Sequence, residues 1–147
     1  MISVQTDDFD LNAEYESLRK RSSAGAIVTF CGLVRDLDQT EAIKAIELEH
    51  YPGMTEKSLQ AIVDIAQQRW SVHHVRVIHR VGKLHANDQI VFVGVSSAHR
   101  QDAFSACEFI MDYLKTQAPF WKKQISQSGE YWVEAKLSDS NAAKRWS

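Results

Sequence analysis

A chain of 147 residues, 44% of them hydrophobic, is long enough to bury the core of one compact domain, and no linker or internal repeat divides it. The formal net charge of −2 argues against a general nucleic-acid binder, because such proteins carry strongly basic domains. The chain has neither a signal-peptide pattern nor a run of about eighteen apolar residues, which a membrane span requires. We therefore expect one soluble, cytoplasmic domain over residues 1–147 that binds neither nucleic acid nor membranes.

The cysteine and histidine residues give no sign of a metal site. Cys31 and Cys107 stand far apart, with no CxxC pair and no Cys/His cluster, so neither a disulfide framework nor a zinc site is indicated. His73, His74 and His79 fall in one predicted strand without a carboxylate or cysteine at ligand spacing. We predict that the protein holds no metal and no cofactor.

The first predicted elements are one helix and two strands. Residues 11–18 place apolar side chains at helical spacing behind Asp10, a candidate N-cap. Residues 24–36 (AGAIVTFCGLVRD) are rich in β-branched and bulky side chains, which favours a buried strand. Residues 42–51 alternate apolar and charged side chains, the pattern of a strand with one face in water.

A second helix and two further strands follow. Thr55 is a candidate N-cap for this helix, and the apolar stripe behind it is assigned to the core: Leu59, Ile62, Val63, Ala66 and Trp70. Residues 73–84 alternate again, and residues 88–97 form an apolar run that ends at Ser96 and Ser97. Both segments predict strands.

The longest predicted helix spans residues 98–117 and stops before Pro119, because proline lacks an amide donor and clashes with the preceding turn. Lys115 and Lys122 therefore do not share one helical face, and a turn must bring them together if they converge. Residues 130–137 predict a last short strand before a polar tail. The order α-β-β-α-β-β-α-β predicts an α+β domain with a mostly antiparallel or mixed sheet.

Three cationic residues stand at predicted element ends, where an anion can bind. If Ser97 caps the third helix, His99 and Arg100 lie in its first turn, where free amides favour anions and disfavour cations. A bound phosphate would resolve that misfit; alternatively, the arginine points away into solvent. Arg35 follows a predicted strand, where it either meets a ligand or pairs with Asp36 on the surface.

The stretch YLKTQAPFWKK at residues 113–123 contains three lysines around a proline and two large aromatic residues. Taken singly, each has a structural explanation: Lys115 is stabilised by the helix dipole and by Asp112, while Lys122 and Lys123 extend from an aromatic anchor into water. No acid pair, nucleophile or nucleotide-binding motif accompanies these cations. Such a set suits an anionic substrate whose reacting atom is brought by another molecule.

Several blocks of the chain together resemble the large, catalytic subunit of molybdopterin synthase: TFCGLVRD, LEHYPGMTEK, IHRVGKL, IVFVGVSSAHR, FIMDYLKTQAPFWKK, and WVEAKLSD followed by AAKRW. The resemblance runs from about Gly25 to the C-terminus. It implies an α/β-hammerhead fold with a small additional antiparallel β subdomain. It also implies a homodimer in which each protomer binds one small, ubiquitin-like sulfur-carrier subunit, giving a heterotetramer.

The resemblance further implies a reaction in molybdenum cofactor biosynthesis. Members of this family are sulfurtransferases that convert cyclic pyranopterin monophosphate, called precursor Z, to molybdopterin by inserting two dithiolene sulfurs. The sulfur comes from the C-terminal Gly-Gly thiocarboxylate of the small subunit, so the nucleophile belongs to another chain. Two alternatives stay open: a non-catalytic adaptor that docks a ubiquitin-like tail, and a stand-alone enzyme acting on a phosphate ligand.

Position by position, the resemblance assigns catalytic roles to Lys115 and Lys122. It assigns contacts with the substrate to a wider cationic set: Arg35, His99, Arg100, Lys115, Lys122 and Lys123. Lys136 stands where an arginine is common in such sequences, and a lysine cannot supply the bidentate fork of a guanidinium. Cys31 and Cys107 are expected to be structural, because the transferred sulfur resides on the partner.

Overall fold

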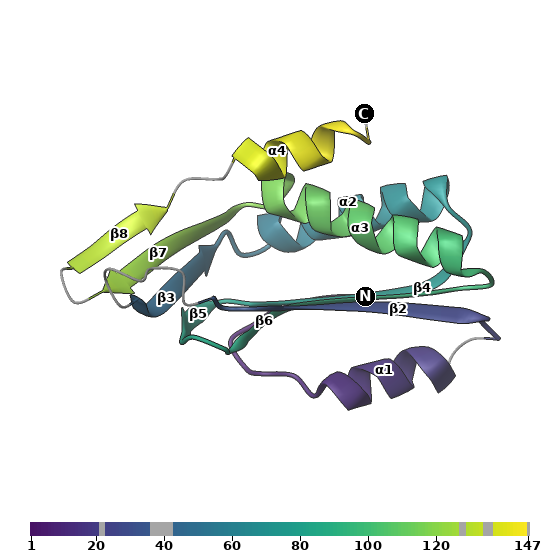
Figure 1. Ribbon diagram of the computed structural model, residues 1–147, viewed down its shortest axis with the longest axis horizontal. Coiled ribbons are helices and arrows are strands. Elements are labelled where there is room, and N and C mark those ends of the chain that lie inside the picture. The colour runs from purple at the N-terminus through teal and green to yellow at the C-terminus, as the bar shows by residue number, and fades with distance from the viewer. Residues whose placement is uncertain (21–22, 36–42, 127–128, 134–136, 147) are drawn as a thin grey trace.

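The computed structural model describes residues 1–20, 23–35, 43–126, 129–133 and 137–146. These residues form two four-stranded sheets with helices packed around them, an α+β arrangement as predicted (Figure 1). The elements in chain order are β1 (Ile2–Gln5), α1 (Leu11–Lys20), β2 (Ala26–Leu33), β3 (Ile43–His50), α2 (Met54–Arg69), β4 (Val72–Arg80), β5 (Gly82–Leu84), β6 (Gln89–Ser97), α3 (Arg100–Gln117), β7 (Phe120–Ser126), β8 (Gly129–Val133) and α4 (Leu137–Lys144).

The main sheet has the strand order β1-β4-β6-β2 and is mixed, because β1 runs parallel to β4 while the other pairs are antiparallel. Helix α1 covers one face of this sheet, and α2 and α3 cover the other (Figure 1). Strand β2 is an edge strand of the main sheet, and α3 packs against it.

The second sheet has the order β5-β3-β7-β8, all antiparallel, and lies at one end of the main sheet (Figure 1). It is the additional antiparallel subdomain that the family resemblance implies. An apolar cluster joins it to the main sheet: Val34, Ile46, Leu48, Val81 and Leu84, with Phe120 packed against them. The end of β2 and the beginning of β7 are therefore brought to the same junction.

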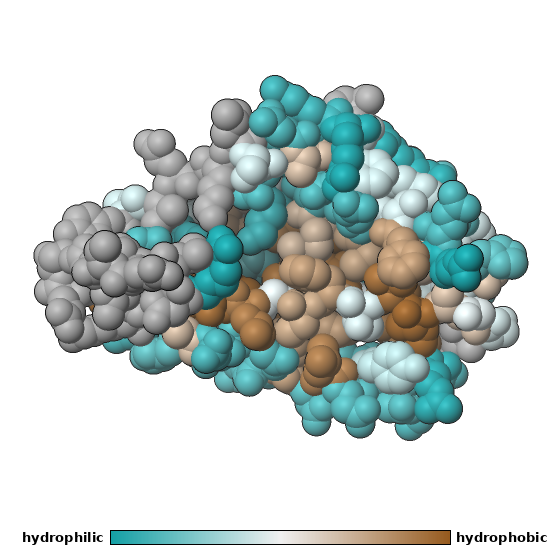
Figure 2. Space-filling model, viewed as in Figure 1, coloured by the Kyte–Doolittle hydropathy of each residue, from teal (hydrophilic) through white to brown (hydrophobic). Residues whose placement is uncertain are grey.

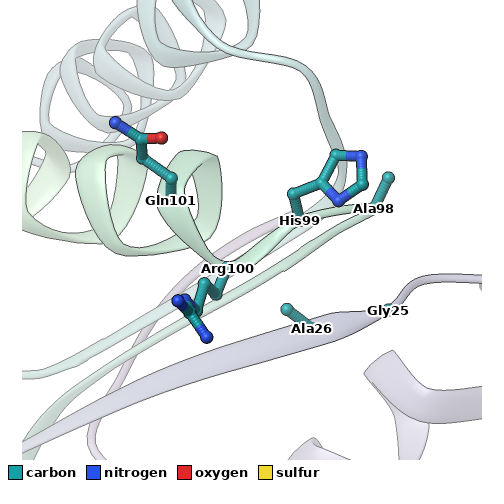
Figure 3. Close-up of a pocket in the computed structure, with 6 residues that line it drawn as sticks. All are labelled: Gly25, Ala26, Ala98, His99, Arg100 and Gln101. Carbon is teal, nitrogen blue, oxygen red and sulfur yellow. The ribbon is translucent and has the colours of Figure 1, made fainter.

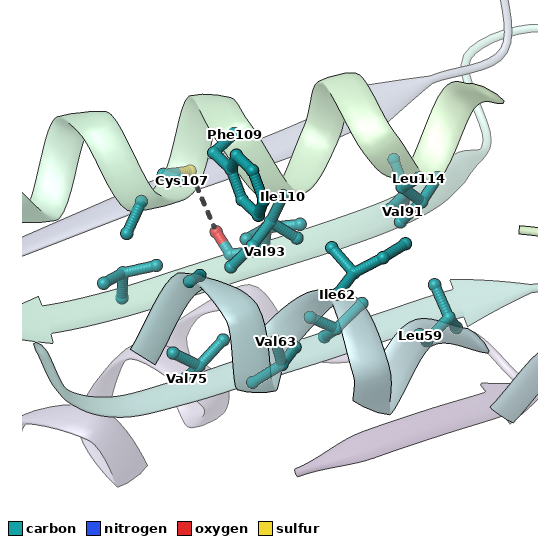
Figure 4. Packing of buried hydrophobic residues seen from close by; sticks show 14 of the residues in the cluster. Leu59, Ile62, Val63, Val75, Val91, Val93, Cys107, Phe109, Ile110 and Leu114 are labelled. Atoms are coloured by element: carbon teal, nitrogen blue, oxygen red, sulfur yellow. Dashed lines mark hydrogen bonds between the residues drawn. The ribbon is translucent and has the colours of Figure 1, made fainter. Parts of the chain in front are cut away.

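The largest apolar cluster lies between the main sheet and the pair α2 and α3 (Figure 4). The stripe predicted for α2 is confirmed, since Leu59, Ile62, Val63 and Ala66 are buried and Trp70 packs against the same cluster. The Cys107 thiol faces the carbonyl oxygen of Val93 at 3.9 Å within this core. Burial, and next the charge of Glu108, raises the pKa of Cys107 to about 12, so its thiol stays protonated and suits a structural role.

Aromatic rings tie the C-terminal helix to this core. Trp146 meets Trp70 and Phe109 edge to face, with ring centroids 5.5 and 5.7 Å apart. The indole Nε1 of Trp146 donates to Asp112 at 2.6 Å, and Arg145 donates to Asp112 at 2.8 Å. The segment predicted as a polar tail thus contains a docked helix, α4, and the two residues that follow it are held by contacts that no local pattern reveals.

Two other elements escape prediction from sequence. Strand β1 is short and extends only by pairing with β4, with Ile2 opposite Val77. No strand was predicted after Pro119, yet β7 begins at Phe120 and pairs with β3 and β8. Its side chains alternate in direction, which decides where the lysines point.

The helix caps agree with prediction in one case of three. Asp10 caps α1, accepting from the Ala13 amide at 3.1 Å. Thr55 is wrong as a cap: α2 has Gly53 at its N-cap, and the Thr55 side chain is buried inside the first turn. Ser97 is also wrong, because the N-cap of α3 is His99 in an extended conformation.

Candidate functional site

A pocket of about 400 Å³ opens where β2 begins and β6 passes into α3 (Figure 3). Its lining is Gly25, Ala26, Ala98, His99, Arg100 and Gln101. Figure 3 shows the Arg100 side chain extending from the helix start toward β2, while the His99 ring lies beside Ala98. Both side chains are exposed, and the first turn of α3 offers free amides beside them. The pocket therefore combines the elements of an anion site.

Only glycine fits at position 25, directly before β2. A Cβ atom on Gly25 would lie 2.4 Å from the carbonyl oxygen of Ala98, far inside contact distance. The close approach is held by the Gly25 amide, which donates to the Ser97 carbonyl oxygen at 3.0 Å. The Ser97 hydroxyl accepts weakly from the His99 amide at 3.4 Å, which is the remaining part of its predicted capping role.

A second cationic group lies at the other end of α3. The helix ends at Gln117 with Ala118 extended, which confirms the stop before Pro119. Lys115 is exposed in the last turn, and Lys122 is half-buried in β7. In the sheet register Lys122 lies opposite the buried Leu48, so Lys122 and Phe120 share the face of β7 that meets the main sheet.

Lys123 points to the opposite face of the second sheet. It lies opposite Glu47 and Trp132, with its Nζ atom 3.4 Å from Glu130 and 4.9 Å from the Trp132 ring centroid. Trp121 lies on the same outer face and is 47% exposed, so it does not line the space between Lys115 and Lys122. The structure thus separates two lysines that the sequence places side by side.

His79 completes the surroundings of the lysines and was missed as a site residue. Its ring is 5% exposed and stacks on Phe120, with centroids 3.9 Å apart and planes 19° apart. Burial is the main cause that lowers the pKa of His79 to about 4. The hydrogen bond to the Arg80 carbonyl raises this pKa, while the charges of Lys115 and His50 lower it. The imidazole is therefore neutral near pH 7, a state that sequence spacing cannot reveal.

The buried His79 predicts acid sensitivity. Its pKa is about 4 in the fold and 6.5 ordinarily, so the unfolded chain binds this proton more tightly. The associated stability is complete above pH 6.5 and is lost as pH falls toward 4, by about 3 kcal/mol. Urea unfolding of wild type and His79→Phe between pH 7.5 and 4 measures this difference. Parallel pH dependence in both proteins would contradict the assignment.

Arg35 lies at the same end of the molecule as the lysines. It is exposed and directly follows Val34, which is buried in the cluster that also contacts Phe120. The Val34 amide donates to the Asp88 carbonyl oxygen at 2.9 Å and its carbonyl accepts from Asn87 at 2.8 Å, which fixes the backbone before Arg35. The predicted pairing with Asp36 lies outside the described residues.

The predicted substrate contacts therefore fall into two groups at opposite ends of one chain (Figure 1). Arg100 begins α3 and Lys115 lies in its last turn, so at 1.5 Å per residue they are about 22 Å apart along the helix axis. Ala26 and Leu33 begin and end β2, about 23 Å apart at 3.3 Å per residue, and Arg35 lies two residues beyond Leu33. His99 and Arg100 cannot meet Arg35, Lys115 and Lys122 within one chain.

An apolar surface lies between the two groups. Figure 2 shows hydrophobic side chains across the middle of the molecule, along the β2 edge between α1 and α3. Phe30 and Leu33 of β2 are 40% and 50% exposed, and Phe104 of α3 is 59% exposed. An edge strand flanked by exposed apolar side chains is typical of an interface.

Among the described residues, neither a reactive cysteine nor a group of metal ligands accompanies these cationic side chains. Cys31 lies on β2 with its thiol 3.5 Å from Gln89, and burial, then the charge of Asp8, raises its pKa. In the described part of the chain, no three His, Cys, Asp or Glu side chains are grouped to hold a metal ion. No helix in the described ranges is long and apolar enough to cross a membrane.

The fold and the site define a class of α+β protein in which a helix-covered mixed sheet meets a second antiparallel sheet at a cationic junction. A model of the MoaE protein family matches residues 4–117. The "Molybdopterin synthase catalytic subunit" of Vibrio cholerae is 57% identical over 145 residues, which cover 99% of this chain and 97% of that protein. The chain belongs to the MoaE family.

Solved structures agree with this membership. The "Molybdopterin biosynthesis MoaE protein" from Burkholderia ambifaria is 53% identical, with a TM-score of 0.86, covering 99% of this chain and 97% of that one. A Helicobacter pylori structure described as a complex of subunits 1 and 2 of molybdopterin-converting factor has a TM-score of 0.77, covering 92% of this chain and 91% of that one. At 16% identity it shows a common fold.

Proposed function

We propose that this chain is the catalytic subunit of a cytoplasmic molybdopterin synthase, with residues 1–147 acting as one domain. The observation that carries the proposal is the family match over most of the chain, combined with cationic groups that lack a nucleophile of their own. The substrate is cyclic pyranopterin monophosphate, and the sulfur arrives as the thiocarboxylate of a small ubiquitin-like subunit. The Helicobacter pylori complex, of the same fold, supports a two-subunit assembly.

The active site is shared between two copies of the chain. A two-fold axis through the middle of β2 places the end of one β2 beside the beginning of the other, so Arg35 approaches the pocket that holds the partner copy's His99 and Arg100. The apolar β2 edge, with Phe30 and Phe104 exposed, supplies the contact surface. This homodimer carries a small subunit at each site, giving the heterotetramer.

Each shared site has a division of labour among its cations. Arg35, His99 and Arg100 hold the phosphate and the pterin edge, where a guanidinium can bind two oxygens at once. Lys115 and Lys122 neutralise the thiocarboxylate and stabilise or protonate the oxygen that leaves the substrate carbon as the new C–S bond forms. Water then attacks the acyl carbon of the resulting thioester and breaks its acyl C–S bond, which leaves sulfur on the pterin and releases the carrier as a carboxylate. A second charged carrier must replace it. Lys123 acts only at a distance, through its charge.

Reconstitution tests the proposal against its two alternatives. Purified protein is mixed with precursor Z, with and without thiocarboxylated small subunit, and dithiolene product is measured. We expect product only when the small subunit is present. Product without it would indicate a stand-alone phosphate-ligand enzyme, and binding of the carrier with precursor Z left unchanged would indicate an adaptor.

Mixing two inactive variants tests the shared site. Lys115→Ala and Arg100→Ala homodimers are each expected to be inactive, since every site lacks one cation. After subunit exchange, half of the dimers are mixed and have one intact site, so activity should return to about a quarter of wild type. Dithiolene formation before and after exchange measures this. If the mixture stays inactive although native mass spectrometry shows complete exchange, then Lys115 of one chain and Arg100 of the other do not belong to one site.

A further inference from the structure

The turn between Lys115 and Lys122 joins two parts of the fold. Lys115 lies in the last turn of α3, which packs on the main sheet, whereas Lys122 lies in β7 of the second sheet. The turn at residues 118–120 is the direct link between them, and the Phe120 amide donates to the Ala118 carbonyl oxygen at 2.9 Å within it. The spacing of the two ammonium groups therefore depends on how this turn is held.

Thr55 of α2 holds the turn from one side. Its hydroxyl donates to the Pro119 carbonyl oxygen at 3.0 Å and accepts from the Tyr51 amide at 2.9 Å. The side chain is fully buried, so both bonds are shielded from water and loss of the hydroxyl would leave two backbone groups unpaired. A hydrogen bond fixes direction as well as distance, which an apolar contact does not.

His79 of β4 holds the turn from the main sheet. Its ring lies face to face on Phe120 at 3.9 Å, and Phe120 is the residue at which β7 begins. The Nδ1–H group donates to the Arg80 carbonyl oxygen at 2.8 Å, which fixes the plane of the ring. Because His79 belongs to the main sheet and Phe120 to the second, this stack couples the two sheets between the end of α3, which carries Lys115, and the strand that carries Lys122.

We propose that Thr55 and His79 are positioning residues that set the distance between Lys115 and Lys122. The inference rests on the proposed function of these lysines, and it adds two residues that act through the turn at residues 118–120. Stabilisation of a transition state tolerates only small displacements of the catalytic groups, well below about 1 Å. A loosened turn should therefore lower turnover more than it weakens substrate binding.

Thr55→Val tests the hydroxyl, because it keeps the shape of the side chain. We expect kcat for dithiolene formation to fall by about 10- to 100-fold while KM for precursor Z changes less than about twofold. Thr55→Ser should restore most of kcat, since it returns the hydroxyl. The control is Val63→Ala, a buried change in the same helix about 12 Å away, which should keep kcat at temperatures where it is folded. An equal loss in Val63→Ala or in Thr55→Ser would overturn the positioning role.

Amide hydrogen exchange tests, without an activity assay, whether Thr55 and His79 hold the turn at residues 118–120. The Tyr51 and Phe120 amides of the carrier-free chain should exchange at least about tenfold faster in Thr55→Val, and Phe120 faster in His79→Leu, but neither in Val63→Ala. Unchanged exchange in both variants would overturn the inference even if wild type is active. If wild type forms no dithiolene, the proposed function fails, while the exchange rates still report whether the turn is held as described.

Discussion

Lys122→Ala is expected to slow dithiolene formation by about 10²- to 10³-fold, the usual cost of removing one group that stabilises an oxyanion. Lys123→Ala, one residue further, should slow it by less than about fivefold. The reason is geometric: Lys122 shares a face with Phe120 at the junction, whereas Lys123 pairs with Glu130 on the outer face. The Glu130 side chain of this pair is 58% exposed, and an ion pair that is open to water contributes little to the free energy of folding. Single-turnover rates with saturating thiocarboxylated carrier measure the difference.

The two lysine variants are controls for each other. They remove the same charge from adjacent positions of one strand, so a general electrostatic effect on carrier docking would lower both rates equally. Carrier binding measured by calorimetry separates docking from chemistry. Equal rates for the two variants would show that the face of β7 does not decide function, and the catalytic assignment of Lys122 would then be wrong.

Phe109→Ala is expected to lower the free energy of unfolding by about 3–5 kcal/mol, as for other fully buried aromatic side chains. The Phe109 ring contacts Trp70, Tyr113 and Trp146, so its removal opens a cavity where α2, α3 and α4 meet. The midpoint of thermal unfolding should fall by about 10–20 °C. Urea unfolding followed by circular dichroism gives the free energy.

Met54→Ala is the matched control for that measurement. Met54 is a large hydrophobic residue too, but it is 53% exposed at the start of α2, so its loss should cost less than about 1 kcal/mol. A similar loss of stability in both variants would mean that Phe109 is not at the centre of the core. If Phe109→Ala released only α4 and left the midpoint of thermal unfolding unchanged, the expected loss of unfolding free energy would likewise be wrong.

Local patterns predicted α1, α2, α3 and most of the described strands well, because the periodicity of apolar residues reflects which side is buried. The stripe from Leu59 to Ala66 is buried as expected, and α3 stops before Pro119 because of the chemistry of proline itself. Asp10 caps α1 for an equally local reason. These features depend on residues within a few positions of each other.

Features set by distant residues could not be predicted in the same way. Strand β1 is extended because β4 pairs with it, and α4 is docked because Asp112 holds its end. His79 was placed in a strand, but its stacking on Phe120 depends on where the two sheets meet. The separation of Arg35 from His99 likewise requires the direction of β2 in the sheet, which spacing along the chain does not give.

The aromatic cluster that joins α2, α3 and α4 also makes the protein its own optical probe. Of the four tryptophans, Trp70 and Trp146 lie in this cluster with their rings 5.5 Å apart, whereas Trp121 and Trp132 are 47% and 58% exposed. Acrylamide should quench the exposed pair first, leaving emission and near-ultraviolet dichroism that come from the cluster. Release of the C-terminal helix could then be timed in the unlabelled protein.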